Sequence, residues 1–107
     1  MKQKMTRRPT HPGEIIKYDY MEPLDFTIKD LAEKLHTSRK TLSGIINGHT
    51  AVTVDMALRL SRAFDTSPGL WLNLQQAVDL WKANNSDGEW KTIERVFIPD
   101  TQPEIHA

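Results

Sequence analysis

A short polar run, Ser38-Arg39-Lys40-Thr41, offers hydrogen-bond donors for phosphates and for base edges together. Arginine and lysine neutralise phosphates, and arginine can also donate two parallel hydrogen bonds to O6 and N7 of guanine. Lys and Arg are ordinary on protein surfaces, however, so the run by itself is equally consistent with a solvated basic face. The elements that position these side chains distinguish the two interpretations.

The residues around this run predict two short helices joined by a tight turn. Thr27 can cap a first helix over 27–35, whose apolar residues recur at i, i+3, i+4 and i+7. Ser38 can cap a second helix over 38–46, which Asn47-Gly48 ends, and its outward positions include Arg39 and Lys40. The connection over 36–38 has the length of a DNA-binding helix-turn-helix unit. This spacing favours a DNA reader.

Three further helices are predicted. The first begins at His11-Pro12-Gly13-Glu14 and ends at Pro23, because the residue before a proline avoids the helical region. Another starts at the cap Thr53 and runs to 64, and the last extends over 67–83. We therefore expect an all-α, five-helix domain over 11–83. The basic arm over 1–10 either lies along DNA or contacts nothing.

The last helix carries more apolar surface than one buried face requires. Part of this surface belongs to the core, but a small monomer rarely exposes a large apolar patch, so the remainder predicts a subunit interface. The candidates are Leu72, Leu80 and Trp81. A two-fold dimer would hold two recognition helices about one DNA turn apart.

After a loop over 84–88, the tail over 84–107 changes to an extended pattern. Residues 90–98 are β-branched and aromatic, and they predict a β-strand that contains Val96 and Ile98. A lone strand needs a ladder partner, which a sister subunit or another protein could supply, unless the tail is disordered. We expect pairing with another chain, which adds Val96 and Ile98 to the dimer interface.

Composition excludes several classes of protein. The 107 residues contain no cysteine, no run long enough to span a membrane and no apolar stretch typical of a secretory signal, so we expect a cytoplasmic protein. The four histidines lack metal-site spacing, and no nucleophile or phosphate-loop motif is present, so we expect no enzyme, metal or cofactor. The net charge is zero, which disfavours nucleic acid. Residues 1–53, however, hold nine Lys or Arg against six Asp or Glu.

Several motifs together resemble the HigA-type antitoxins of the lambda-repressor-like (XRE) helix-turn-helix family. The matching segments cover about seventy of the 107 residues and are HPGEII at 11–16, MEPL at 21–24, LAEKL at 31–35, SRKTLSGIINGH at 38–49, VTVDMALRLSRAF at 52–64 and SPGLWLNLQQAVDLW at 67–81. The match does not reach the tail. The resemblance implies a homodimeric antitoxin of a type II toxin-antitoxin system. Such a protein binds double-stranded operator DNA, represses its own operon and neutralises a cognate RelE-like, mRNA-cleaving toxin.

Family DNA contacts carry over to named positions of this sequence. Base-contacting positions fall on Ser38, Arg39, Lys40, Thr41, Ser43 and Gly44. Phosphate-contacting positions fall on Thr27, Lys29, Asn47, His49 and Thr53. Gly44 departs from repressors that have a long polar side chain there, which leaves Arg39 and Lys40 with most of the reading. Two alternatives remain open: a stand-alone XRE-type repressor without a toxin partner, and a protein-binding module that has lost DNA contact.

Overall fold

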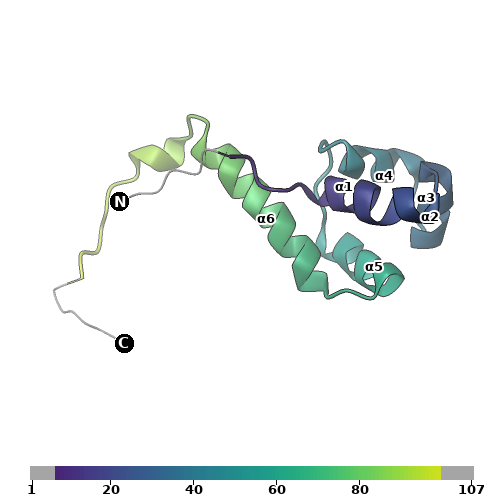
Figure 1. Ribbon diagram of the computed structural model, residues 1–107. Coiled ribbons are helices and arrows are strands. Elements are labelled where there is room, and N and C mark those ends of the chain that lie inside the picture. The colour runs from purple at the N-terminus through teal and green to yellow at the C-terminus, as the bar shows by residue number, and fades with distance from the viewer. Residues whose placement is uncertain (1–6, 100–107) are drawn as a thin grey trace.

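The computed structural model describes residues 7–99, which form helices and connecting loops. The elements are α1 (Pro12–Ile15), η1 (Ile16–Met21), α2 (Glu22–Leu24), α3 (Ile28–Leu35), α4 (Arg39–Ile46), α5 (Val54–Phe64), α6 (Pro68–Asn84) and η2 (Glu89–Thr92). Because α1, η1 and α2 follow one another without a break, they act as one helix (Figure 1). The predicted all-α, five-helix domain is confirmed. Figure 1 shows residues 85–99 leading away from this domain.

Each of these five helices begins at a side chain that accepts a hydrogen bond from a backbone N–H of its first turn. The caps are His11, Thr27, Ser38, Thr53 and Ser67. Such a cap typically stabilises a helix by about 1 kcal/mol, because the first amides have no partner within the helix. The predicted starts at these residues are therefore explained by local hydrogen bonds.

The helix formed by α1, η1 and α2 continues through Pro23, so the prediction that this proline ends it is wrong. The helix reaches Leu24, and Asp25 ends it in the left-handed conformation with φ of 57°. The preceding segment η1 is π-helical, and its last bond runs from the Glu22 N–H to the Lys17 carbonyl, five residues back. A π turn shifts the hydrogen-bond register of the helix by one residue. Proline has no backbone N–H, and with this shift the helix does not depend on a hydrogen bond from position 23.

The core lies where α1 and η1 pack over α3, α4, α5 and the start of α6. Its fully buried side chains are Ile16, Leu31, Leu42, Ile45, Leu60, Trp71 and Val78. Each large apolar side chain contributes roughly 1.5–3 kcal/mol when removed from water. The Trp71 indole N–H donates to Thr66 Oγ1 at 2.7 Å, which satisfies the one polar group of this side chain. The domain thus holds α4 on a continuous apolar base.

The predicted β-strand at 90–98 is wrong. Residues Glu89–Thr92 form a 3-10 turn, and residues 93–99 form neither helix nor strand. The Ile93 N–H bonds the Trp90 carbonyl at 3.2 Å, within its own segment. β-propensity reflects packing against neighbouring strands, and residues 7–99 contain no other strand that could act as a ladder partner. Residues 100–107 lie outside the described range, as do residues 1–6 of the basic arm.

Two further findings concern residues 7–99. No helix in this range is long and apolar enough to cross a membrane. Nor do three or more His, Asp or Glu side chains there come close enough together to hold a metal ion.

Candidate nucleic-acid interface

Helix α4 divides into a buried face and an exposed basic face. Leu42 and Ile45 are buried in the core, whereas Arg39 and Lys40 are exposed. Neither cation forms an ion pair or a hydrogen bond with another described residue. Since their charges are not neutralised within the domain, both side chains are available to a polyanion.

The hydroxyls of Ser38 and Thr41 shape the first turn of α4. Ser38 Oγ accepts from the Thr41 N–H at 3.0 Å and donates to Thr41 Oγ1 at 2.9 Å. The Thr41 hydroxyl keeps its own proton, which can still be donated to a phosphate or a base. Ser43, one turn later, is partly exposed and accepts from Asn47 Nδ2 at 3.3 Å.

Gly44 lies close to the loop that follows α4. Its carbonyl accepts from the His49 N–H at 2.8 Å and from the Thr50 N–H at 3.0 Å. A Cβ at position 44 would collide with Thr50 Oγ1 and lie 3.0 Å from Thr50 Cβ. A side chain at position 44 would therefore require the Thr50 side chain to move, so glycine suits the close approach of Thr50 to α4.

The positions predicted to contact phosphate lie at helix starts and in the α4–α5 loop. Thr27 and Thr53 cap α3 and α5, and both are exposed. The others, Lys29, Asn47 and His49, are also exposed. Helix N-termini carry partial positive charge and N–H groups, which suits phosphate oxygens.

Arg59 of α5 holds the turn of the helix-turn-helix unit. Its guanidinium donates to the Leu35 carbonyl at 3.0 Å and to the His36 carbonyl, and its Nε pairs with Asp55 at 2.8 Å. These carbonyls belong to the end of α3, where His36 is left-handed with φ of 56°. In the sequence, the i,i+4 spacing of Asp55 and Arg59 indicates only an ion pair along α5. It does not indicate the contact of Arg59 with the turn after α3.

Gln75 links α6 to the loop after α4. Its Oε1 accepts from the Val52 N–H at 2.9 Å, and its Nε2 donates to Asp79 at 3.0 Å. Gln75 is buried, so the bond from Val52 is shielded from water, whereas Asp79 is exposed. The loop that carries Thr53 is therefore fixed to α6, which sequence reasoning also missed.

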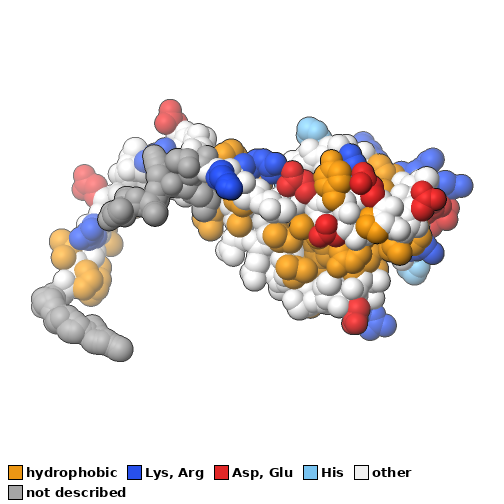
Figure 2. Space-filling view, in the orientation of Figure 1, with side chains coloured by type: hydrophobic (Ala, Val, Ile, Leu, Met, Phe, Trp, Pro, Cys, Tyr) orange, Lys and Arg blue, Asp and Glu red, His pale blue; other side chains and the backbone are white. Residues whose placement is uncertain are grey.

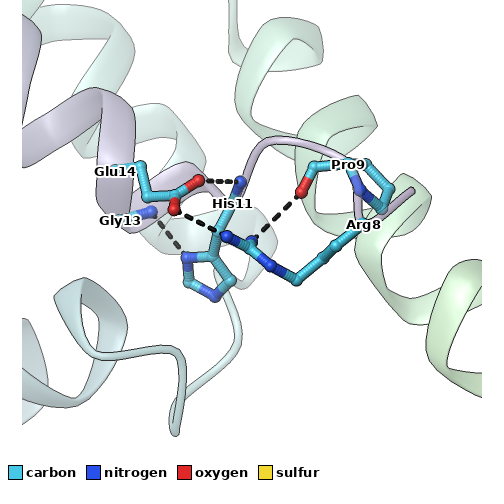
Figure 3. A network of polar contacts seen from close by, with 5 residues as sticks. All are labelled: Arg8, Pro9, His11, Gly13 and Glu14. Carbon is cyan, nitrogen blue, oxygen red and sulfur yellow. Dashed lines mark hydrogen bonds and ion pairs between the residues drawn. The ribbon is translucent and has the colours of Figure 1, made fainter.

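A polar network fixes the start of α1 (Figure 3). The Gly13 N–H donates to His11 Nδ1 at 2.9 Å, and the His11 N–H donates to Glu14 Oε1 at 2.9 Å. Glu14 Oε2 pairs with Arg8 at 2.8 Å. The basic arm is thus attached to the domain at Arg8. Burial lowers the pKa of His11, and the neighbouring Lys82 and Arg8 lower it further against the opposing charges of Glu14 and Asp79.

This network predicts that stability depends on His11 protonation. A protonated Nδ1 cannot accept from Gly13, and the folded pKa lies below the unfolded one, so stability is full above about pH 6.5 and falls as the pH drops below it. We expect a loss of about 1 kcal/mol, the usual worth of an N-cap. Urea unfolding between pH 7.5 and 5 measures it. His11→Asn, which retains a capping side chain, should flatten the profile, whereas His36→Asn at an exposed site should not. Equal profiles for all three proteins would contradict the prediction.

The predicted dimer residues differ in exposure. Leu72 is half-buried and packs against the core, whereas Leu80 is 56% exposed. Trp81 is half-buried, and its indole N–H has no partner among the described residues. Val96 and Ile98 are exposed, at 98% and 69%. Figure 2 shows hydrophobic side chains on the segment after α6.

A capped helix over Ile28–Leu35, a three-residue turn and a second helix with an exposed basic face define a helix-turn-helix protein. The family model "Helix-turn-helix" matches residues 18–71. The chain belongs to this helix-turn-helix family, in its XRE-type branch, which includes HigA antitoxins.

Relatives and solved structures are similar over nearly the whole chain. YbaQ of Escherichia coli, which is named an uncharacterized HTH-type transcriptional regulator, is 52% identical over 96 residues, which are 90% of this chain and 84% of that protein. The antitoxin HigA-1 of Vibrio cholerae is 39% identical over 97 residues, 90% of this chain and 91% of that one. The structure of the Pseudomonas aeruginosa antitoxin HigA with the higBA promoter has a TM-score of 0.73 at 36% identity, covering 88% of this chain and 100% of that chain.

Proposed function

We propose that this protein is a DNA-binding antitoxin that represses its own operon as a homodimer and neutralises a cognate toxin. The observation that carries the DNA-binding part is the exposed face of α4. Arg39 and Lys40 stand on it without intramolecular partners, and the capped first turn holds them in place. Base contacts by such side chains specify sequence, whereas contacts around them position the protein.

The neutral net charge is compatible with this proposal because the charges are separated. Residues 1–53 carry a net charge of +3, from nine basic and six acidic residues, and they contain α3 and α4. Phosphate neutralisation depends on the local surface that meets DNA. The acidic second half remains available for a different partner.

The antitoxin part rests on relatives. HigA-1 of Vibrio cholerae is named as an antitoxin, and a structural neighbour is the antitoxin GraA in complex with its operator, at a TM-score of 0.77 and 36% identity. We infer by family resemblance that the toxin is an mRNA-cleaving ribonuclease of the RelE-like class. A stand-alone repressor is the second candidate, because YbaQ carries the name of a transcriptional regulator.

Two measurements test the function. Binding to the DNA upstream of its own reading frame, followed across a salt series, should weaken with a log-log slope of several units, since each neutralised phosphate contributes about 0.9. Absence of binding at low salt would rule out the proposed DNA-binding function. Co-expression with the product of the neighbouring reading frame then separates the candidates. An antitoxin restores growth and co-purifies with that product, whereas a stand-alone repressor does neither.

We further propose that Leu80, with Leu72, Trp81, Val96 and Ile98, forms the dimer interface. Leu80 lies near the C-terminal end of α6 with 56% of its surface exposed, and Val96 and Ile98 are further exposed apolar side chains on the tail. Burying these side chains against one another would stabilise the dimer by about 25 cal/mol per Å² of apolar surface removed from water.

Leu80→Glu should shift the protein toward monomer in sedimentation equilibrium. A buried, unpaired carboxylate opposes association strongly, and we expect the dimer to weaken at least tenfold. Leu58→Glu is a matched control, because Leu58 is exposed to a similar extent, at 49%, on α5. A Leu80→Glu dimer as stable as the Leu58→Glu dimer would place the interface elsewhere.

A further inference from the structure

A hollow of about 270 Å³ lies beside the C-terminal end of α4. Three separate parts of the chain line it: the segment before α1, the start of the α4–α5 loop, and the last turns of α6. The charged and polar lining side chains are Arg8, His11, Glu14, Asn47 and Lys82. Figure 2 shows Lys and Arg side chains where the segment before α1 passes between α6 and the rest of the domain.

The two cations in this hollow come from sequence positions more than seventy residues apart. Lys82 is exposed and makes no hydrogen bond or ion pair with another described residue. Burial, and then the nearby charges of Lys82 and Arg8, lower the pKa of His11, whereas Glu14 and Asp79 raise it, so charges of both signs surround this ring. Arg8 is paired with Glu14 at 2.8 Å, so Lys82 is the cation of this hollow whose charge no described residue neutralises, and an anion beside it would be favoured.

Arg8 is positioned with donors to spare. It uses one N–H for Glu14 at 2.8 Å and one for the Pro9 carbonyl at 3.2 Å. A guanidinium has five N–H donors, so three remain. Glu14 is itself held by the His11 N–H, as Figure 3 shows. The α1 cap therefore keeps the guanidinium at the rim of the hollow.

We propose that Arg8 and Lys82 form a second phosphate-contacting site, which binds the backbone of the same DNA duplex that α4 reads. The site is continuous with Asn47, a predicted phosphate-contacting residue in the first position after α4. If Asn47 contacts a phosphate, the hollow is the protein surface next to that contact. The sequence left open that the basic arm, which contains Arg8, lies along DNA, but nothing in the sequence pattern indicated Lys82. The proposal rests on the proposed DNA-binding function.

The test compares Arg8→Gln and Lys82→Gln with the wild-type protein and with Lys91→Gln, a change at an exposed lysine of η2. The probes are the DNA upstream of the reading frame and a scrambled duplex of the same length. Arg8→Gln and Lys82→Gln should each reduce the magnitude of the log-log salt slope by about 0.9 on both probes. If a variant and the wild type bind equally at 1 M salt, this change corresponds to roughly eightfold weaker binding by the variant at 0.1 M salt. Lys91→Gln should match the wild type.

Other outcomes overturn the proposal. Slopes equal to the wild-type slope show that neither cation contacts phosphate. Weaker binding at an unchanged slope, with an altered melting temperature or sedimentation profile, shows that these residues act through stability or dimerisation instead. If the wild-type protein binds neither probe, the proposed function fails rather than this site alone.

Discussion

Gly13→Ala is expected to destabilise the domain by roughly 3 kcal/mol, the upper end of the usual range for overpacking. A Cβ at position 13 would collide with the Ile45 carbonyl and would lie 2.6 Å from both Cα and the carbonyl oxygen of Ile46. All three atoms are backbone atoms of α4, so no side-chain rotation relieves the contact. Helix α1 must move away from α4, and part of the core must open.

The sign of this effect is not obvious from helix propensity. Alanine is better than glycine inside a helix by roughly 0.5–1 kcal/mol, which favours the variant. The collision outweighs this gain because the neighbouring backbone cannot yield locally. Urea unfolding measures the difference, and operator binding should weaken in parallel, because α1 braces the recognition helix.

Gly69→Ala is the matched control. Gly69 also lies in the first turn of a helix, but a Cβ there meets only Ser67 Oγ at 4.0 Å. This variant should be more stable than the wild type by about 0.5–1 kcal/mol. If Gly13→Ala were also stabilising, the close approach of α1 to α4 would not exist in solution.

Arg39→Ala is expected to weaken operator binding by roughly 1–3 kcal/mol and to relax the preference at one base position. Arg39 is exposed on the first turn of α4, and no described residue occupies its guanidinium. The fold should be unaffected, because the side chain packs against nothing in the core. Binding selection from a randomised DNA pool measures both affinity and preference.

Arg39→Lys separates base reading from charge. Lysine retains the positive charge but lacks the planar fork that bonds guanine through two donors. We expect it to keep the salt slope of the wild type while losing most of the base preference. An Arg39→Ala variant that selects the same sequences as the wild type would show that Arg39 contacts only phosphate or solvent.

Much of the fold is readable from the sequence because its signals are local. Thr27, Ser38 and Thr53 each bond an amide three residues ahead, so each cap is visible in a short window. The apolar spacing that predicted the buried face of α3 agrees with the burial of Leu31, Ala32 and Leu35. The prediction failed for the tail. The β-branched residues at 93–98 favour a strand, but a strand also needs a neighbouring strand to pair with, and residues 7–99 contain none.

By itself, the sequence determined where the helices start, which faces are buried and which basic side chains stand on α4. Only the tertiary structure decided which distant groups meet. Arg59 reaches a carbonyl 24 residues earlier, Gln75 reaches an amide 23 residues earlier, and Gly13 touches the backbone of α4. The physical reason is that capping and periodicity act within one or two turns, whereas these contacts depend on how whole helices pack. The basic hollow beside α4 exists for the same reason.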